Sequence, residues 1–366
     1  MSQPRKPVEY SEYLQLERLL GSQALKSVEQ GKPAHDEMLF VIVHQAYELW
    51  FKQILHELDS VMALFRADSV DERSIGVAVS RLLRIVEIQR LLIDQLRILE
   101  TMTPLDFLDF RDLLLPASGF ESVQFRLIEM KLGLRREQRV TPGRVQAPPA
   151  LEEQRLALAE AQAGPSLFDL VERWLERTPF LELPGYQFWQ SYRQAVETML
   201  AKDRITIQES AVLAEVEREA QLKELDVTRK SFEGLFDEKT HERLQAEGLR
   251  RMSFRATLAA LLIHLYREQP ILHLPFRFLT ALVEIDELLA SWRYRHALMV
   301  HRMIGAKIGT GGSSGHRYLL ATVERHKVFT DLYNLSTFLI SRSALPPLPP
   351  DVQARMGFVY AKEGSE

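Results

Sequence analysis

The sequence predicts an all-α protein, and three observations support this. Nearly every long segment of the 366 residues repeats its apolar positions at intervals of three and four, which is the helical period. Almost no segment alternates apolar and polar residues by two, as a half-buried strand does. The composition, 46% hydrophobic and 26% charged, is that of a globular chain large enough for one big core or two modest domains.

The first half of the chain contains two long predicted helices and one well-marked helix start. Residues 36–66 and 73–100 form two long amphipathic segments. The stretch "TPLDFLDFRDLL" then begins a helix, with Thr103 as N-cap, Pro104 in the first turn and Asp106 three residues after the cap. This spacing is that of a capping box.

The middle of the chain is predicted to be helical but less regular. "GFESVQFRLIEMKLGL" should end near Gly133, and we expect one short helix in the Pro-rich connection that follows. Ser166 and Asp169 are placed to cap the next helix. A highly charged helical stretch covers residues 208–247.

The C-terminal part is predicted to contain two more helices and a tail. Residues 276–304 form a helix that ends at Gly305, and the last helix is "YLLATVERHKVFTDLYNLSTFLI". The tail, residues 343–366, is Pro-rich and is expected to be loose.

The bulk properties exclude several classes of function. A formal charge of −4 and a pI near 6.3 provide no basic surface for nucleic acid, and no apolar run predicts a membrane span. The start, "MSQPRKPVEYSEY", lacks the apolar stretch of a secretory signal, so we expect a cytoplasmic protein. The chain has no cysteine, which excludes thiolate-ligated haem, iron–sulfur clusters and cysteine-based zinc sites.

Two of the ten histidines lie on apolar helix faces. The residues that share a face with His44 are Phe40, Val41, Tyr47, Phe51 and Leu55. Those that share a face with His296 are Leu289, Trp292, Met299, Val300 and Met303. His301 lies about 140° around the helix from His296, so the two cannot both bind one flat macrocycle. Each histidine is either a metal ligand or a core residue bonded to a carbonyl or carboxylate, and periodicity does not choose between His296 and His301.

Arg111 presents a similar choice. It follows Phe107 by four residues, which places its guanidinium beside an aromatic face. The planar fork suits a carboxylate bound at two points. That carboxylate belongs either to a substrate or to a neighbouring acid, namely Asp106, Asp109 or Asp112. The turn "PASGF" adds the hydroxyl of Ser118 nearby.

The segment "KIGTGGSSGHRY", residues 307–318, is rich in glycine. It lacks the Gly-Lys-Ser/Thr ending of a P-loop, and it follows a helix where the nucleotide-binding motifs require a strand. It is therefore either a mobile connection or a lid that closes over a ligand, with the Thr310 hydroxyl among its polar groups.

Five blocks of the sequence together resemble one family. They are "YSEYLQLERLL", "HDEMLFVIVHQAYELWFKQILHELDSV", "DFLDFRDLLLPASGFESVQFRLIEMKLG", "WRYRHALMVHRMIGAKIGTGGSSGHRYL" and "KVFTDLYNLSTFLI". In this order, from about residue 10 to residue 341, they are similar to the signature segments of the tryptophan 2,3-dioxygenases. The resemblance implies a single all-α haem dioxygenase domain over residues 1–342, with a less typical helical insert at about 135–250.

The resemblance also implies an activity, a cofactor and an assembly. Members are homotetramers with one haem b per subunit. They insert both atoms of O₂ across the indole C2–C3 bond of L-tryptophan to give N-formyl-L-kynurenine, the first step of tryptophan catabolism. An alternative on the same scaffold is a haem-dependent monooxygenase of another aromatic substrate. A helical sensor protein and a non-haem iron site are further alternatives, but a sensor needs no carboxylate clamp and no HExxH pattern is present.

The resemblance assigns roles to particular residues. It implies that His296 is the axial haem ligand, that His44 accepts a hydrogen bond from the indole N–H, and that Arg111 binds the substrate carboxylate. Thr310 would bind the amino and carboxylate end of the substrate. Other implied contacts are Phe40, Phe107 and Ser118 in the pocket, and Tyr10 and Tyr13 from a neighbouring subunit.

Overall fold

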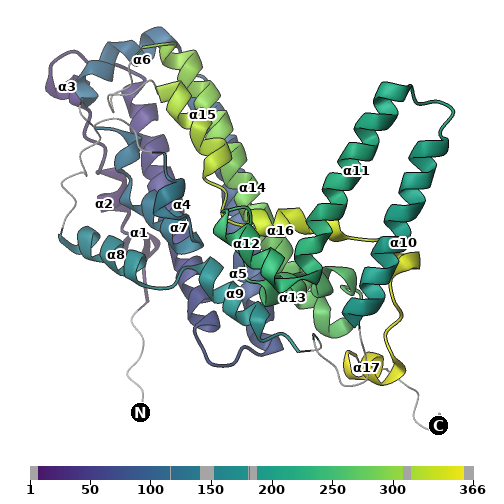
Figure 1. Cartoon of the computed structure of the whole chain (residues 1–366). Helices are drawn as coiled ribbons and strands as arrows, with labels where there is room; N and C mark the ends of the chain where they lie inside the picture. The colour runs from purple at the N-terminus through teal and green to yellow at the C-terminus, as the bar shows by residue number, and fades with distance from the viewer. Residues whose placement is uncertain are drawn as a thin grey trace, which may run out of the picture.

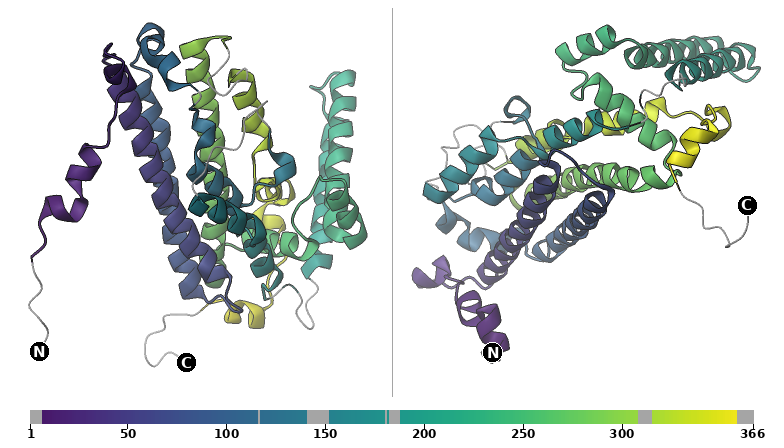
Figure 2. Two further views of the ribbon diagram at one scale, coloured as in Figure 1. Left: turned by 90° about the vertical axis from the view of Figure 1, so that its left-hand side faces the viewer. Right: turned by 90° about the horizontal axis from the view of Figure 1, so that it is seen from below.

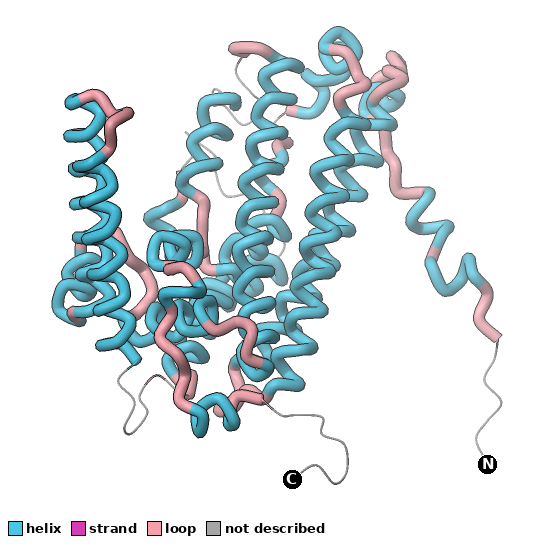
Figure 3. Tube along the Cα trace, turned by 90° about the vertical axis from the view of Figure 1, so that its right-hand side faces the viewer, coloured by secondary structure: helices cyan, strands magenta, loops and turns pink. Residues whose placement is uncertain are grey.

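The computed structural model describes residues 7–115, 117–140, 152–179, 181, 188–307 and 315–357. Within these ranges every regular element is an α-helix or a short 3-10 helix, and none is a strand (Figure 3). The all-α prediction is confirmed. Among the helices of the same ranges, none is both long and apolar enough to cross a membrane.

Three long helices form the centre of the molecule: α4 (Glu37–Phe65), α5 (Glu72–Leu99) and α14 (Pro270–Ile304). Both α4 and α14 pack along α5, and α15 (Gly315–Arg325) lies alongside α14 (Figure 1). Leu58, Leu82 and Leu282, one from each long helix, are completely buried between them. Burial of each such side chain contributes about 1.5–3 kcal/mol to the free energy of folding, which stabilises the packing of the three helices.

The helix boundaries in the first half follow the sequence signals. The bounds of α4 and α5 agree with the predicted ranges to within one residue at each end. Asp71 caps α5 by accepting a hydrogen bond from the Ser74 amide at 2.7 Å. Thr103 and Asp106 form the predicted capping box at the start of α6 (Pro104–Arg111).

The middle of the chain also contains the predicted elements. α7 (Val123–Leu132) ends at Gly133, whose φ of 119° favours glycine. Ser166 and Asp169 form the second predicted capping box, at α9 (Leu167–Glu176), which packs against α13 (Phe254–Leu265). The short helix expected in the Pro-rich connection is α8 (Glu152–Ala163).

The charged stretch predicted at 208–247 is divided among three helices: α10 (Phe188–Glu209), α11 (Glu215–Phe236) and α12 (Glu238–Ala246). The Asp237 carboxylate accepts a hydrogen bond from the Thr240 amide at 2.8 Å, so a new helix starts there and the stretch is not continuous. Helices α10 and α11 form a hairpin that stands apart from the central helices (Figures 1 and 3).

Helix α14 begins earlier than predicted. Its first residue is Pro270, six residues before the expected start at 276. Proline is well tolerated in the first helical turn because its missing N–H has no partner there. Pro275, which lies just before the predicted start, is accommodated inside the helix and is buried.

The last predicted helix is interrupted. After α15 the chain starts again as α16 (Thr330–Asn334), followed by a 3-10 turn at Leu335–Phe338. The buried carboxylate of Asp286 accepts hydrogen bonds from the amides of Val328 and Phe329, at 2.9 and 3.0 Å. A continuous helix would direct these amides to its own carbonyls instead. The other 3-10 turns are Asp112–Leu114, Gly119–Glu121, Arg136–Gln138 and Arg342–Ala344.

Part of the tail that was expected to be loose is packed against the body. α17 (Pro350–Arg355) buries Val352, and the next residue, Met356, is also buried. The Met356 carbonyl accepts a hydrogen bond from the Ile271 amide at 3.0 Å, which ties the tail to the start of α14. Residues 350–356 are therefore attached to the body by these buried apolar side chains and by this hydrogen bond.

The N-terminal segment projects from the side of the molecule opposite to the hairpin (Figure 2). It contains the short helices α1 (Tyr10–Leu14), α2 (Leu16–Leu20) and α3 (Lys26–Glu29). The buried Glu37 carboxylate accepts hydrogen bonds from the amides of Lys26 and Ser27, which attaches α3 to α4. Before α3, the segment exposes much of its apolar surface.

Candidate active site

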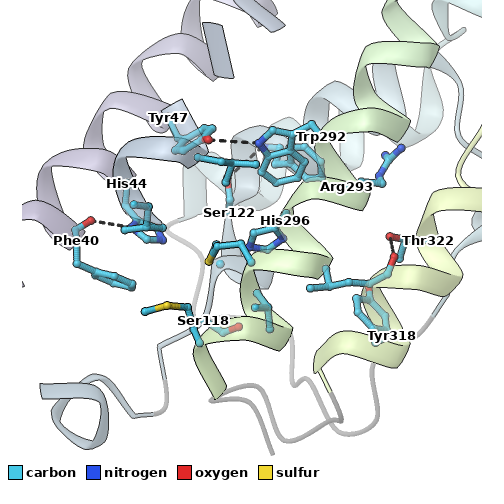
Figure 4. Close-up of a pocket in the computed structure, with 18 of the residues that line it drawn as sticks. Phe40, His44, Tyr47, Ser118, Ser122, Trp292, Arg293, His296, Tyr318 and Thr322 are labelled. Atoms are coloured by element: carbon cyan, nitrogen blue, oxygen red, sulfur yellow. Dashed lines mark hydrogen bonds between the residues drawn. The ribbon is translucent and has the colours of Figure 1, made fainter. Parts of the chain in front are cut away.

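A cavity of about 300 Å³ is lined by residues of α4, α5, α6, α7, α14 and α15 (Figure 4). Its volume is at the lower end of the range of small-molecule sites. Its walls are mostly apolar with a few polar groups, which is the usual composition of such sites. The lining includes Phe40, His44, Tyr47, Phe107, Arg111, Ser118, Phe125, Arg126, Glu129, Trp292, Arg293, His296, Met299, Met303, Tyr318, Thr322 and His326.

The cavity brings together six of the residues singled out from the sequence: Phe40, His44, Phe107, Arg111, Ser118 and His296. They come from α4, α6, the turn after α6, and α14, and the first and last are 256 positions apart in the chain. Tyr10 and Tyr13 do not line it, since they lie on the projecting N-terminal segment with 74% and 75% of their surface exposed. Thr310 lies outside the described residues.

His44 is held by its own helix. Its Nδ1–H donates to the carbonyl of Phe40 at 2.7 Å, and the two rings lie 4.1 Å apart. With Nδ1 as the donor, Nε2 is the acceptor nitrogen of the neutral ring. The surrounding protein atoms displace water and lower the pKa of His44, although its surface remains accessible from the cavity. The ring is therefore a neutral hydrogen-bond acceptor at pH 7.

His296 lies across the cavity from His44, on α14. Its Nδ1 is buried and has no hydrogen-bond partner among the described residues. Burial, with a smaller contribution from His44, lowers the pKa of His296 to about 4. Buried polar atoms are nearly always paired, so an imidazole left without a partner is unusual. It is neutral at pH 7 and has a lone pair available for a metal.

A cluster of buried or partly buried polar and charged side chains, defined here as the ionic wall, lines another side of the cavity. It consists of Arg126, Glu129, Arg293 and His326. Glu129 Oε1 accepts from Arg293 Nη2 at 2.9 Å and from His326 Nδ1 at 3.1 Å, and Oε2 accepts from Arg126 Nη1 at 2.9 Å. Burial alone would raise the pKa of Glu129, but the bond from His326 and the two guanidinium charges lower it to about 2.

His301 and His316 are close to each other, and neither lines the cavity. Their ring centroids are 4.3 Å apart, and His316 Nδ1 donates to the Ala297 carbonyl at 3.1 Å. On α14 it is therefore His296, and not His301, that faces the cavity. Of the two, only His296 is therefore in a position to bind a ligand in the cavity.

Proteins with similar sequences belong to one family. The family model described as tryptophan 2,3-dioxygenase matches residues 3–339. A tryptophan 2,3-dioxygenase of Bdellovibrio bacteriovorus is 54% identical over 97% of this chain and 99% of its own length. One from Alteromonas mediterranea is 49% identical over 96% and 98%, and tryptophan 2,3-dioxygenase B of Danio rerio is 49% identical over 97% and 86%.

The chain belongs to the tryptophan 2,3-dioxygenase family. The match extends across the charged middle segment, where the sequence blocks alone were least typical. The family assignment therefore covers the hairpin of α10 and α11 as well as the helices that surround the cavity.

Sequence reasoning within this family's blocks missed the ionic wall. Glu129 lies in the middle of the apolar face of α7, and a carboxylate in such a position needs a buried cation. This signal was available in "SVQFRLIEMKLGL", but the partners Arg293 and His326 are 164 and 197 positions away. Tyr318 and Thr322, on α15 beside His326, were missed for the same reason.

Proposed function

We propose that this protein is a haem-dependent dioxygenase that inserts both atoms of O₂ across the indole C2–C3 bond of L-tryptophan and yields N-formyl-L-kynurenine. The observation that carries the proposal is the pair of neutral histidines on one largely apolar cavity. His44 has its Nδ1 bonded to its own helix, while Nδ1 of His296 has no partner. This pair suits a cofactor bound on one side and a substrate oriented on the other.

The residues fit haem b, and His296 would hold its iron. The buried, neutral imidazole and the apolar lining by Met299 and Met303 suit a flat apolar macrocycle. No group of three or more His, Cys, Asp or Glu side chains that could hold a metal ion by itself occurs in the part of the chain that the structure describes. When bound, ferrous haem supplies the position at which O₂ is activated. The proposed haem domain is residues 1–342, a range that includes every residue lining the cavity.

His44 orients the substrate in this proposal. Its Nε2 is the acceptor nitrogen, so it receives the indole N–H and fixes the ring in the cavity. Phe40 and Phe107, whose ring centroids are 5.7 Å apart, provide the apolar surface for the indole. The proposed reaction needs no covalent protein nucleophile, and His44 acts by hydrogen bonding rather than as an obligatory base.

The amino-acid end of the substrate is bound by polar groups near α6. Arg111, in the last turn of α6, pairs with the carboxylate, and the Ser118 hydroxyl lines the same region. We further propose that Thr310 contacts the amino and carboxylate end and that its glycine-rich segment acts as a lid. This part of the proposal rests on the sequence resemblance alone.

Tyr10 and Tyr13 act in a neighbouring subunit of a homotetramer in this proposal. Two large aromatic side chains with about three quarters of their surface exposed, on a segment that projects from the body, are suited to an interface (Figure 2). The cavity of each subunit would then be completed by the segment of its neighbour.

The test is reconstitution. The purified chain is titrated with haem under anaerobic, reducing conditions, and then exposed to air with L-tryptophan while the products are identified by mass spectrometry. We expect stoichiometric haem binding and N-formylkynurenine. Haem binding with a hydroxylated product in place of N-formylkynurenine would replace the dioxygenase by a monooxygenase. Failure to bind haem would overturn the proposal.

A further inference from the structure

Beside His296 the structure contains an arrangement of aromatic residues that the proposed roles do not use. Trp292, one helical turn earlier on α14, stacks on the imidazole with an interplanar angle of 11° and a centroid distance of 5.1 Å (Figure 4). A metal-bound histidine usually has its ring orientation set by a hydrogen bond from its second nitrogen. Among the described residues, Nδ1 of His296 makes no such bond. The packing of neighbouring rings is then what holds the orientation of the imidazole.

Trp292 is itself held in place by two other helices. Its indole Nε1–H donates a long hydrogen bond, 3.4 Å, to the hydroxyl of Tyr47 on α4. The ring of Phe125, on α7, lies 5.3 Å from the indole. Because the indole is bonded at its edge and packed at its rings, its plane has little freedom to rotate.

Tyr47 anchors this arrangement in the core. Its hydroxyl donates to the main-chain carbonyl of Leu92, on α5, at 2.6 Å, and 7% of the residue is exposed. Burial raises the pKa of Tyr47 to about 12, so the hydroxyl stays protonated and serves as donor and acceptor together. The contacts run from α5 through Tyr47 and Trp292 to His296, and they link the cavity to the central helices.

We propose that Trp292 and Tyr47 are positioning residues that set the orientation of the His296 imidazole toward the haem iron. The proposal rests on the proposed function, because it requires His296 to be the axial ligand. It goes beyond that function because it proposes that a stacked indole, and not a hydrogen-bond acceptor, fixes the orientation of the imidazole. The indole would fix the ring without accepting a hydrogen bond from Nδ1, so the imidazole would remain a neutral ligand. An acceptor at Nδ1 would increase the basicity of the ligand.

The experiment measures the iron–histidine bond instead of turnover. The iron–histidine stretching band is recorded by resonance Raman spectroscopy for the ferrous haem-bound forms of the wild type, Tyr47→Phe and Trp292→Phe. Tyr47→Phe removes only the hydroxyl, so it should fold even if Trp292→Phe does not. The haem reduction potential is measured for the same proteins.

Two matched controls lie away from the cavity. Tyr192→Phe also removes a fully buried hydroxyl that donates to a main-chain carbonyl, that of Phe338. Trp174→Phe changes a buried indole packed between the rings of Phe65 and Phe278. Both controls test whether any loss of core packing alters the band.

We expect Tyr47→Phe and Trp292→Phe to shift or broaden the band and to change the reduction potential, with the larger change in Trp292→Phe, while both controls match the wild type. A band unaltered in Tyr47→Phe and Trp292→Phe, or equally altered in the controls, would overturn the positioning role and leave the proposed function intact. Absence of an iron–histidine band in the wild type would overturn both, and only that outcome bears on the function.

Discussion

The two sides of the cavity differ in how their polar groups are paired. In the ionic wall, the Glu129 carboxylate is paired with the guanidinium groups of Arg126 and Arg293 and accepts a hydrogen bond from His326. In the opposite wall, defined as the aromatic wall, are Phe40, His44 and Phe107, and Nε2 of His44 is left as an acceptor. Histidine occurs in both walls. His326 is bonded to Glu129 and is structural, whereas His44 keeps an acceptor nitrogen for a ligand. The ionic wall should matter for stability and the aromatic wall for substrate.

The largest expected effect comes from breaking the ionic wall. Glu129→Gln leaves the buried Arg293 without its counter-charge, and removal of one partner of a buried pair costs about 3–5 kcal/mol of folding free energy. The measurement is urea-induced unfolding at pH 7. The control is Glu197→Gln, in the exposed pair with Arg193, for which we expect about 1 kcal/mol or less. Equal losses in the two variants would show that the ionic wall is not the structural side.

The same carboxylate should contribute to acid sensitivity. Its pKa in the folded state, about 2, is below the ordinary value of 4.5, so the unfolded state binds more protons in acid. The stabilisation is complete above about pH 4.5 and is lost as the pH falls toward 2. Unfolding free energies of the wild type and Glu129→Gln should therefore converge over this window. A constant difference from pH 7 to pH 2 would contradict the assignment.

Removal of the proposed axial ligand should abolish firm haem binding. For His296→Ala we expect haem affinity to fall by more than about 100-fold, since loss of a group that merely supports a metal ligand costs about 10- to 100-fold. His301→Ala, five residues later on the same helix and outside the cavity, is the matched control and should bind haem normally. Haem titration of both apoproteins measures this. The reverse result would assign the iron to His301.

Arg111 should affect binding of the substrate carboxylate. Because hydrogen bonds to charged groups contribute about 1.5–3 kcal/mol, Arg111→Ala should raise KM for L-tryptophan about 10- to 100-fold. Tryptamine, which has no carboxylate, is the matched ligand, and its affinity should not change. If Arg111→Ala weakened both ligands equally, or lowered only the stability of the fold, its partner would be a protein acid instead.

The smallest expected effect belongs to the aromatic wall. His44→Ala removes one neutral hydrogen bond, of about 0.5–1.5 kcal/mol, so kcat/KM should fall about 2- to 10-fold and some activity should remain. The preference for L-tryptophan over its 1-methyl derivative, which lacks the indole N–H, should fall by the same factor. Complete loss of activity with haem and tryptophan still bound would make His44 an essential base.

Local features of the fold followed from the sequence because their partners are near in the chain. The capping boxes of Thr103 with Asp106 and of Ser166 with Asp169 each span three residues. The interruption between α15 and α16 did not follow, because it depends on Asp286, more than 40 positions earlier. Periodicity describes one helix at a time. It cannot show which distant group accepts hydrogen bonds from the amides of that segment.

The same limit applies to the site. His44 and His296 were recognisable as polar residues on apolar faces, but only the folded chain brings both onto one cavity. The role of Trp292 was hidden, because an indole on an apolar helix face is most often ordinary core. Its bond to Tyr47 joins residues 245 positions apart.

The most direct test of the central claim is isotopic. The haem-loaded protein is supplied with ¹⁸O₂ and L-tryptophan in ordinary water, and the product is analysed by mass spectrometry immediately after quenching. The account predicts N-formylkynurenine that carries two ¹⁸O atoms, because both oxygen atoms are inserted across one bond. A product with a single ¹⁸O atom, and a second oxygen from water or none, would contradict it and identify a monooxygenase.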